Sequence, residues 1–371
     1  MIRDLRRFDY PMLLSCLLLV GYGLALIYSG SLALYGTSHA ALTHAVFKQA
    51  AFAVVGLLLL GLLTQIDYRV WSNLAPILYG LTIVGLLAVL VIGQRAFGSR
   101  RWFSLAALQL QPSELAKLVT IIFLAKFLSD DRRRIHTVRG FLTALGIAAV
   151  PALLVFVEPD LGTAIVFLAV WLGMIYVAGA RARHLLTFVG ACVASIPFIV
   201  VAGLSGYQKD RFQSFIDPGK DPLGAGFNTL QAQISIGSGG LFGKGWTHGP
   251  QTQLAYLRTQ TTDYIFSVLG EELGFIGALA LFFLFIVLLF RGLRTASRSN
   301  DDFGRYIATG IVVMIVVQLF INIGVNVRLF PVTGIPLPFI SQGGSSLLTM
   351  FAAIGILQSI AVRRRATPFR F

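Results

Sequence analysis

The chain has 371 residues, of which 56% are hydrophobic and only 12% carry a charged side chain. The mean hydropathy is +0.78, and the formal net charge at pH 7 is +14. These values exclude an ordinary soluble domain and predict a protein that lies in a membrane. Cys16 and Cys192 fall inside apolar stretches without metal or disulfide spacing, so they do not indicate a redox compartment.

Ten apolar stretches are long enough to cross a bilayer. A spanning helix needs roughly 20 apolar residues, because the hydrocarbon core is about 30 Å thick and the backbone must satisfy its own hydrogen bonds there. We expect transmembrane helices at about 11–30, 46–65, 72–93, 112–128, 140–157, 161–180, 184–205, 264–290, 306–327 and 340–362. The first stretch lacks a signal-peptide cleavage site, so we expect it to remain as a helix. The predicted fold is all-α, with residues 1–371 forming a single polytopic membrane domain of about ten helices.

Lysine and arginine are distributed unevenly over the predicted loops. When alternate loops are assigned to opposite sides, most of the 30 basic residues fall on one side, which is then the cytoplasmic side. Both termini belong to that side. The positive charge is therefore explained by topology and by anionic lipid headgroups, and it implies no nucleic acid partner.

One long loop, at about 206–263, is predicted on the opposite, outer side. A loop of this length is functional or disordered, and its apolar, helix-like content argues against disorder. We expect a short amphipathic helix over 228–236, and the glycines that follow it at 237–245 let the backbone adopt positive φ or approach another segment closely. A phosphate-binding P-loop is excluded because Lys244 is followed by Gly245, and the five histidines lack the spacing of zinc ligands.

Two opposite charges are predicted inside the helix at 112–128. Glu114 and Lys117 are three residues apart, so they lie on one helical face and can pair. A structural ion pair and a part in a substrate site are both open alternatives. The second alternative is competitive because charges at membrane depth are costly and are usually functional.

Carboxylates and basic residues also gather near the outer face. Asp160 lies between two predicted helices, Asp263 closes the long loop, and Arg100 and Arg101 precede the helix at 112–128. Such a set suits an anionic amphiphile, because Arg and Lys can hold a pyrophosphate and a carboxylate can act as general base on a sugar hydroxyl. For Asp160, an ordinary solvated loop acid is the simpler alternative.

At these residues the sequence resembles the SEDS (shape, elongation, division and sporulation) family over nearly its whole length. The motifs that carry the resemblance are Gly98-Ser99-Arg100-Arg101-Trp102, Gln111-Pro112-Ser113-Glu114 with Lys117, Pro159-Asp160-Leu161-Gly162-Thr163, Asp221-Pro222-Leu223-Gly224-Ala225-Gly226, Gln233-Ile234-Ser235-Ile236-Gly237-Ser238-Gly239-Gly240-Leu241, Thr262-Asp263-Tyr264-Ile265-Phe266 and Pro331-Val332-Thr333-Gly334-Ile335-Pro336-Leu337-Pro338-Phe339-Ile340-Ser341. Within the family, Gly243-Lys244-Gly245-Trp246 and the short termini fit the RodA type.

The resemblance implies a peptidoglycan glycosyltransferase that polymerises lipid II at the outer face of the bacterial cytoplasmic membrane during elongation. It implies that Asp263 is the general base. It also implies partnership with a class B penicillin-binding protein and other membrane proteins of the elongation complex. Candidate substrate contacts are Arg100, Arg101, Glu114, Lys117, Asp160, Lys244 and Ser345.

The sequence departs from the family pattern at Gln342 and Arg328, which puts contacts around that outer loop in doubt. No cofactor or metal site is assigned, and a requirement for a divalent cation is left open. The main alternative is a lipid II flippase or other transporter, and a non-catalytic scaffold is a third. The gathering of polar residues near one face favours the enzyme, because a translocation path would be lined with polar residues at the bilayer midplane.

Overall fold

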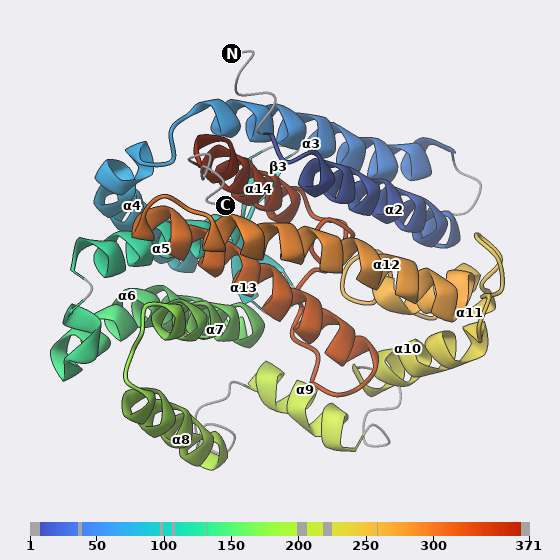
Figure 1. Ribbon diagram of the computed structural model, residues 1–371. Helices are drawn as coiled ribbons and strands as arrows, with labels where there is room; N and C mark the ends of the chain where they lie inside the picture. The colour runs from blue at the N-terminus through green and yellow to red at the C-terminus, as the bar shows by residue number, and fades with distance from the viewer. Residues whose placement is uncertain are drawn as a thin grey trace.

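The computed structural model describes residues 8–35, 39–96, 99–105, 108–131, 133–198, 206–217, 225–257 and 259–364. Ten of its helices correspond one for one to the ten predicted stretches (Figure 1). They are α2 (Tyr10–Tyr35), α3 (His39–Gln65), α4 (Val70–Ile92), α5 (Pro112–Asp130), α6 (Val138–Val157), α7 (Leu161–Val177), α8 (Ala182–Phe198), α12 (Ile265–Ser297), α13 (Asp302–Asn326) and α14 (Gly344–Arg363). Seven helices in the described ranges are long and apolar enough to cross a membrane, and α7 and α8 supply shorter apolar helices. The predicted all-α, polytopic fold is confirmed.

Several helix ends differ from the predicted boundaries, and two of the differences have a clear physical reason. The last helix begins at Gly344 rather than near residue 340, because residues 331–343 form an irregular loop that contains three prolines. The helix predicted at 264–290 continues to Ser297, because Arg291 and Arg294 end the apolar stretch without ending the helix. The last residues of the stretch at 184–205 lie outside the described part of the chain.

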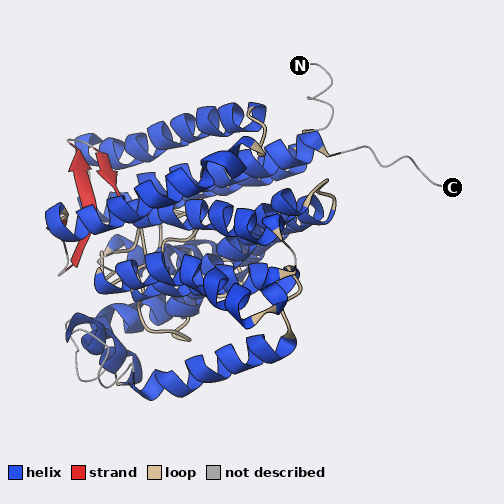
Figure 2. Cartoon of the chain, turned by 90° about the vertical axis from the view of Figure 1, so that its left-hand side faces the viewer, coloured by secondary structure: helices blue, strands red, loops and turns tan. Residues whose placement is uncertain are grey.

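A small antiparallel sheet, which the sequence did not predict, lies at one end of the helical bundle (Figure 2). It contains β1 (Gln94–Ala96), β2 (Ser99–Leu105) and β3 (Leu108–Leu110) in the order β1-β2-β3. Arg95 pairs with Arg100, and Ser104 pairs with Gln109. The sheet turns the segment between α4 and α5 back over the bundle, so that Arg101 faces the loops at this end.

The described part of the long loop is largely helical. It forms α9 (Gly206–Ile216), α10 (Ala225–Gly239) and the short α11 (Pro250–Gln253), and η1 (Arg134–His136) joins α5 to α6 elsewhere in the chain. The helix predicted at 228–236 is confirmed within α10. The motif at 221–224 and Lys220 lie outside the described residues.

The core packs around α13 and the pair α3 and α14, with small residues where helices cross. A Cβ atom on Gly56 would lie 2.1 Å from the Phe351 ring, and one on Gly355 would lie 3.0 Å from the Leu60 backbone. These contacts let α3 and α14 approach closely. The start of α14 is thereby fixed beside α3 at the sheet end of the bundle.

A buried polar node fixes the opposite end of α14. The Arg291 guanidinium binds the Asp9 carboxylate through Nε at 2.8 Å and Nη2 at 2.6 Å, and the Asp9 side chain is 1% exposed. The Gln358 side chain exchanges two hydrogen bonds, of 3.0 and 2.8 Å, with the Asp9 backbone. The start of α2 is thus joined to α12 and α14.

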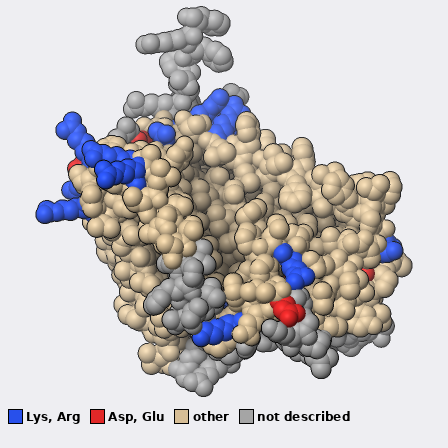
Figure 3. Space-filling view, turned by 90° about the horizontal axis from the view of Figure 1, so that it is seen from below, with Lys and Arg blue, Asp and Glu red and all other residues tan. Residues whose placement is uncertain are grey.

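On the face drawn in Figure 3, most of the visible Lys and Arg side chains gather toward one end.

Candidate active site

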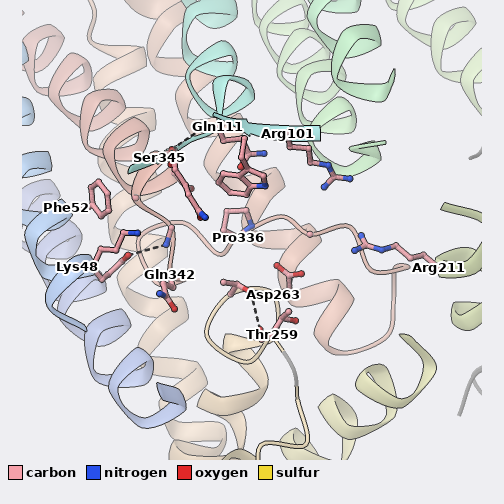
Figure 4. A pocket seen from close by; sticks show the side chains of 18 residues that line it. Lys48, Phe52, Arg101, Gln111, Arg211, Thr259, Asp263, Pro336, Gln342 and Ser345 are labelled. Atoms are coloured by element: carbon pink, nitrogen blue, oxygen red, sulfur yellow. Dashed lines mark hydrogen bonds between the residues drawn. The ribbon is translucent and has the colours of Figure 1, made fainter. Parts of the chain in front are cut away.

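A cavity of about 460 Å³ lies at the sheet end of the bundle (Figure 4). Segments far apart in the sequence line it: α3, the sheet, α9, the turn before α12, and residues 334–346. The lining residues are Lys48, Gln49, Phe52, Arg101, Trp102, Gln109, Gln111, Arg211, Thr259, Thr262, Asp263, Gly334, Pro336, Gln342, Gly343, Gly344, Ser345 and Ser346. The cavity therefore brings together the predicted residues Arg101, Asp263 and Ser345.

The backbone of Asp263 is held firmly from behind by α13. The amide nitrogens of Asn322 and Asn326 donate to the Asp263 carbonyl at 3.2 and 2.9 Å. Asn322 also donates to the carbonyl of Ile335 at 2.8 Å, and the Ser341 hydroxyl donates to the carbonyl of Thr262 at 2.6 Å. The turn that carries Asp263 is thus tied to the loop that forms another cavity wall, and its carboxylate faces the cavity.

Asp263 does not cap α12. The residue at the N-cap is Tyr264, and α12 has no side-chain capping bond. Burial raises the pKa of the Asp263 carboxyl. The guanidinium groups of Arg211 and Arg101 and a hydrogen bond with Thr262 lower that pKa, while the charge of Asp160 raises it. Burial thus makes Asp263 a stronger proton acceptor than an exposed aspartate, and the two arginines favour its charged form.

Arg101 is anchored by the turn between α6 and α7. Its Nε donates to the carbonyl of Glu158 at 3.1 Å, one Nη donates to the carbonyl of Pro159, and the other lies 3.7 Å from Asp160 Oδ2. Asp160 is the N-cap of α7 and accepts bonds of 3.1 Å from the backbone and hydroxyl of Thr163. Asp160 is therefore buried beside the cavity, where it orients Arg101, and it is not a solvated loop acid.

Glu158 is a buried acid beside this anchor. Burial and, less strongly, the charge of Asp160 raise the pKa of its carboxyl to about 8, against the opposing effect of Arg101. The carboxyl is therefore protonated at neutral pH. It leaves Arg101 paired with Asp160, and ionisation above that pKa would place a second carboxylate near the same guanidinium.

The remaining predicted residues lie in different places. Ser345 lines the cavity, donates to the carbonyl of Gln109 at 2.9 Å and accepts from the backbone of Gln111 at 3.1 Å. Glu114 and Lys117 form the predicted pair at 2.7 Å, buried in α5 and absent from the cavity lining. Lys244 is exposed on a turn that packs on α12, away from the cavity. The Arg100 backbone lies in β2, and its side chain is outside the described part of the chain.

Two basic residues of the cavity were missed by sequence reasoning. Lys48 lies near the start of a long apolar stretch, and an isolated lysine at membrane depth is the signal that could have found it. Arg211 lies on α9, and its Nη1 donates to the carbonyl of Val332 at 3.0 Å. Only the fold shows that α9 reaches the cavity.

Among the described residues, no group of three or more His, Cys, Asp or Glu could hold a metal ion, so no ligand set for a divalent cation can be assigned.

Fold and site together define a multi-pass helical membrane protein with a cavity at one end, which is lined by one carboxylate and two guanidinium groups. The chain belongs to the FtsW/RodA/SpoVE family of cell cycle proteins, which is the SEDS family, and the family profile matches residues 10–366.

Named relatives and solved structures agree with this assignment. The chain is 40% identical over 356 residues to stage V sporulation protein E of Bacillus subtilis, covering 95% of this chain and 96% of the relative. It is 38% identical over 357 residues to peptidoglycan glycosyltransferase MrdB of Escherichia coli K12, covering 96% and 94%. It also resembles a chain of the structure reported as "Structural coordination of polymerization and crosslinking by a peptidoglycan synthase complex". That match has a TM-score of 0.80 and 32% identity, and covers 95% of this chain and 97% of that one. The rod shape determining protein RodA of Thermus thermophilus matches with a TM-score of 0.71 and 29% identity, covering 97% and 98%.

Variants of Glu114 and Lys117 test whether this pair stabilises the fold or binds substrate. Lys117→Ala leaves a buried carboxylate without its counter-charge, which typically costs roughly 3–5 kcal/mol, so we expect a lower melting temperature and lower folded yield. The double variant Glu114→Gln/Lys117→Met removes both charges and should recover most of the stability. Lys126→Ala, on the same helix, is the matched control. A Lys117→Ala protein with parental melting temperature but no activity would place the pair in the substrate site.

Proposed function

We propose that the cavity is the site where this chain, a peptidoglycan glycosyltransferase, polymerises lipid II into glycan strands, with Asp263 as the general base. The observation that carries the proposal is the Asp263 carboxylate, which faces the same cavity as Arg101 and Arg211 while its backbone is fixed by α13. Relatives named peptidoglycan glycosyltransferase, such as MrdB, support the reaction class.

The proposed chemistry needs one base and one site for a leaving anion. The Asp263 carboxylate takes the proton of the acceptor sugar's 4-hydroxyl, and that oxygen attacks the anomeric carbon of the donor. The bond from this carbon to the lipid pyrophosphate breaks with inversion, and the bonding electrons leave with the pyrophosphate. Arg101, Arg211 and Lys48 supply the positive charge that stabilises the departing group.

The predicted substrate contacts divide by position. Arg101 and Ser345 face the cavity and are proposed to touch substrate, while Asp160 acts through Arg101. Glu114 and Lys117 satisfy each other inside α5 and are proposed to be structural. Nothing in the geometry supports a substrate contact for Lys244.

The transporter alternative is weaker than the enzyme. The described cavity lies at the sheet end of the bundle, and its lining does not reach the buried node of Asp9, Arg291 and Gln358 at the opposite end of α14. A flippase needs a polar path that reaches both sides of the membrane. The glycosyltransferase names of the relatives point the same way.

Asp263→Asn tests the base directly. Acid–base participation is typically worth about 10²–10⁴ in rate, so polymerisation of labelled lipid II by the purified variant should fall by that factor. Fold and melting temperature should be unchanged, because asparagine has nearly the same shape and Asp263 makes no capping bond. Glu271→Gln should be milder, since Glu271 lies outside the cavity lining. Near-parental polymerisation by Asp263→Asn would remove this residue as the base.

The pH profile tests the charges around Asp263. The base must be ionised, so the rate rises as pH increases through the pKa of Asp263. Arg211→Gln removes a charge that lowers this pKa, and the rise should therefore move to higher pH, whereas Arg211→Lys should restore it. Initial rates measured in a Glu158→Gln background remove the titration near pH 8 that Glu158 would add. Superimposable profiles for Arg211→Gln and its parent would exclude the proposed effect.

The cavity is proposed to face the outer side of the bacterial cytoplasmic membrane, with both termini in the cytoplasm. The excess of basic residues in alternate loops supports this orientation. In intact cells, a membrane-impermeant maleimide should label a cysteine placed at Gln213 on α9 and should not label one at Arg181, between α7 and α8. Labelling of both sites from the same side would contradict the topology.

A class B penicillin-binding protein is proposed as partner of an elongation-type, RodA-like enzyme. The structural similarity to a chain of a peptidoglycan synthase complex supports it. On α12, an exposed apolar stripe has the alternating spacing of three and four residues that seats a second helix. The stripe contains Ile276, Leu279, Phe283, Ile286, Phe290 and Leu293.

Ile286→Trp should block this seat and lower recovery of the penicillin-binding protein when the chain is purified in mild detergent. The lipid-facing substitution Ile77→Trp on α4 is the matched control, because Ile77 is as exposed as Ile286 but lies on another helix. Equal recovery with both variants would exclude the α12 stripe, and recovery of no such partner from native membranes would count against the partnership itself.

A further inference from the structure

The helix α12 is broken near its start, and a glycine-rich turn fills the break. Gly274 has φ +62° and ψ −160°, which ends the helical hydrogen-bond pattern at that point. The turn at 240–245 supplies partners for the interrupted backbone. The four bonds are Lys244 N to Glu271 O at 2.9 Å, Gly245 N to Glu272 O at 3.0 Å, Phe275 N to Gly240 O at 2.9 Å and Ile276 N to Leu241 O at 3.1 Å.

Close approach of the two backbones requires glycine. A Cβ atom at Gly239 would lie 1.9 Å from the Gly270 carbonyl oxygen, and one at Gly243 would lie 2.2 Å from that of Glu272. Gly243 and Gly245 also have positive φ values, of +79° and +99°. These glycines therefore fix the position along α12 at which the turn packs.

Two buried acids hold the chain that leaves the turn. The Glu271 carboxylate accepts from the backbone of Gln251 at 2.7 Å and from the backbone and hydroxyl of Thr252 at 2.9 and 2.7 Å. Glu272 accepts a hydrogen bond from the Ser29 hydroxyl on α2. The turn and α11 are thus joined to α12 and α2 as one unit, and Figure 1 shows these elements side by side.

Contacts with α2 give the depth of the turn. The Trp246 indole donates to the carbonyl of Ala25 at 3.0 Å, and its ring lies 5.5 Å from that of Tyr28. The apolar span of α2 is Tyr10–Leu32, so Ala25 lies seven residues before its end. At 1.5 Å per residue, Trp246 is about 10 Å inside the end of the span. This depth lies within the hydrocarbon of one leaflet.

The outward side chains of the turn are apolar at this depth. Leu241 is 63% exposed, Phe242 is 79% exposed and Trp246 is 47% exposed. They adjoin Phe275, which is exposed on α12 directly after the break. The long side chain of Lys244 can reach the headgroups from here.

We propose that residues 240–246 form a re-entrant turn inserted into the hydrocarbon of the leaflet at the cavity end, where Leu241, Phe242 and Trp246 contact lipid acyl chains. Non-helical backbone is stable at that depth only if protein satisfies its polar groups, and the break at Gly274 supplies those partners. The occupant of this surface is lipid because the turn lies at hydrocarbon depth beside α2 and adjoins Phe275, which is exposed outside the stripe proposed for the partner. The inference holds whichever reaction the cavity performs.

Spin labels on single cysteines test the insertion. In a Cys192→Ser background, where Cys16 is buried, nitroxides are placed by Phe242→Cys, by Ile77→Cys as the lipid control and by Gln213→Cys as the aqueous control. The purified protein is reconstituted in phosphatidylcholine vesicles, and collision rates with oxygen and with a water-soluble nickel chelate are compared. The ratio of oxygen to nickel collisions at residue 242 should match that at residue 77 and exceed that at residue 213 several-fold.

Two results would overturn the proposal: a collision ratio at residue 242 like that at residue 213, or protection from both reagents, which would mean that protein covers the turn. Leu241→Cys gives an independent position if Phe242→Cys folds poorly. As a second readout, brominated phosphatidylcholine should quench the tryptophan fluorescence of the parent more than that of Trp246→Phe. Equal fractional quenching of the two proteins would also contradict insertion.

Discussion

The whole architecture depends on one constraint: a backbone polar group inside hydrocarbon must find its partner in the protein. Long helices satisfy it locally, so deviations from helix need explanation. The described breaks each have a partner segment. The turn before α12 is held by Asn322 and Asn326 on α13, and the interruption at Gly274 is filled by the turn at 240–245. The irregular backbone of this protein is therefore concentrated around the cavity and the surface beside it.

Buried charged side chains also find their partners within the protein. Glu114 with Lys117 and Asp9 with Arg291 are buried pairs that neutralise each other and leave nothing for a ligand. The cavity differs, because the Asp263 carboxylate and the guanidinium groups of Arg101 and Arg211 all line open space, and Arg211 donates to the carbonyl of Val332. Ionisable groups with perturbed pKa values in a cavity are typical of functional sites.

Much of the fold was predictable because spanning helices leave a strong signal. All ten apolar stretches became helices, and the pairing of Glu114 with Lys117 followed from helical spacing alone. The sheet at 94–110 was not predicted, because short strands at a bundle end have neither length nor a clear alternation. Lys244 stood in a motif yet lies away from the cavity, whereas Arg211 stood in no motif and lines it. Motifs identify the family of a sequence, but only the fold shows which residues lie together at the cavity.

Two properties of the Asp263 carboxylate, its direction and its basicity, depend on different residues. Helix α13 contributes no residue to the described cavity lining, yet Asn322 and Asn326 hold the carbonyl of Asp263, and Asn322 also holds that of Ile335. The direction in which the carboxylate points is therefore set from outside the cavity, while its basicity is set within it by burial, which raises its pKa, and by Arg211 and Arg101, which lower it. Substitutions along α13 can therefore change the direction of the acid and leave every residue of the cavity lining in place.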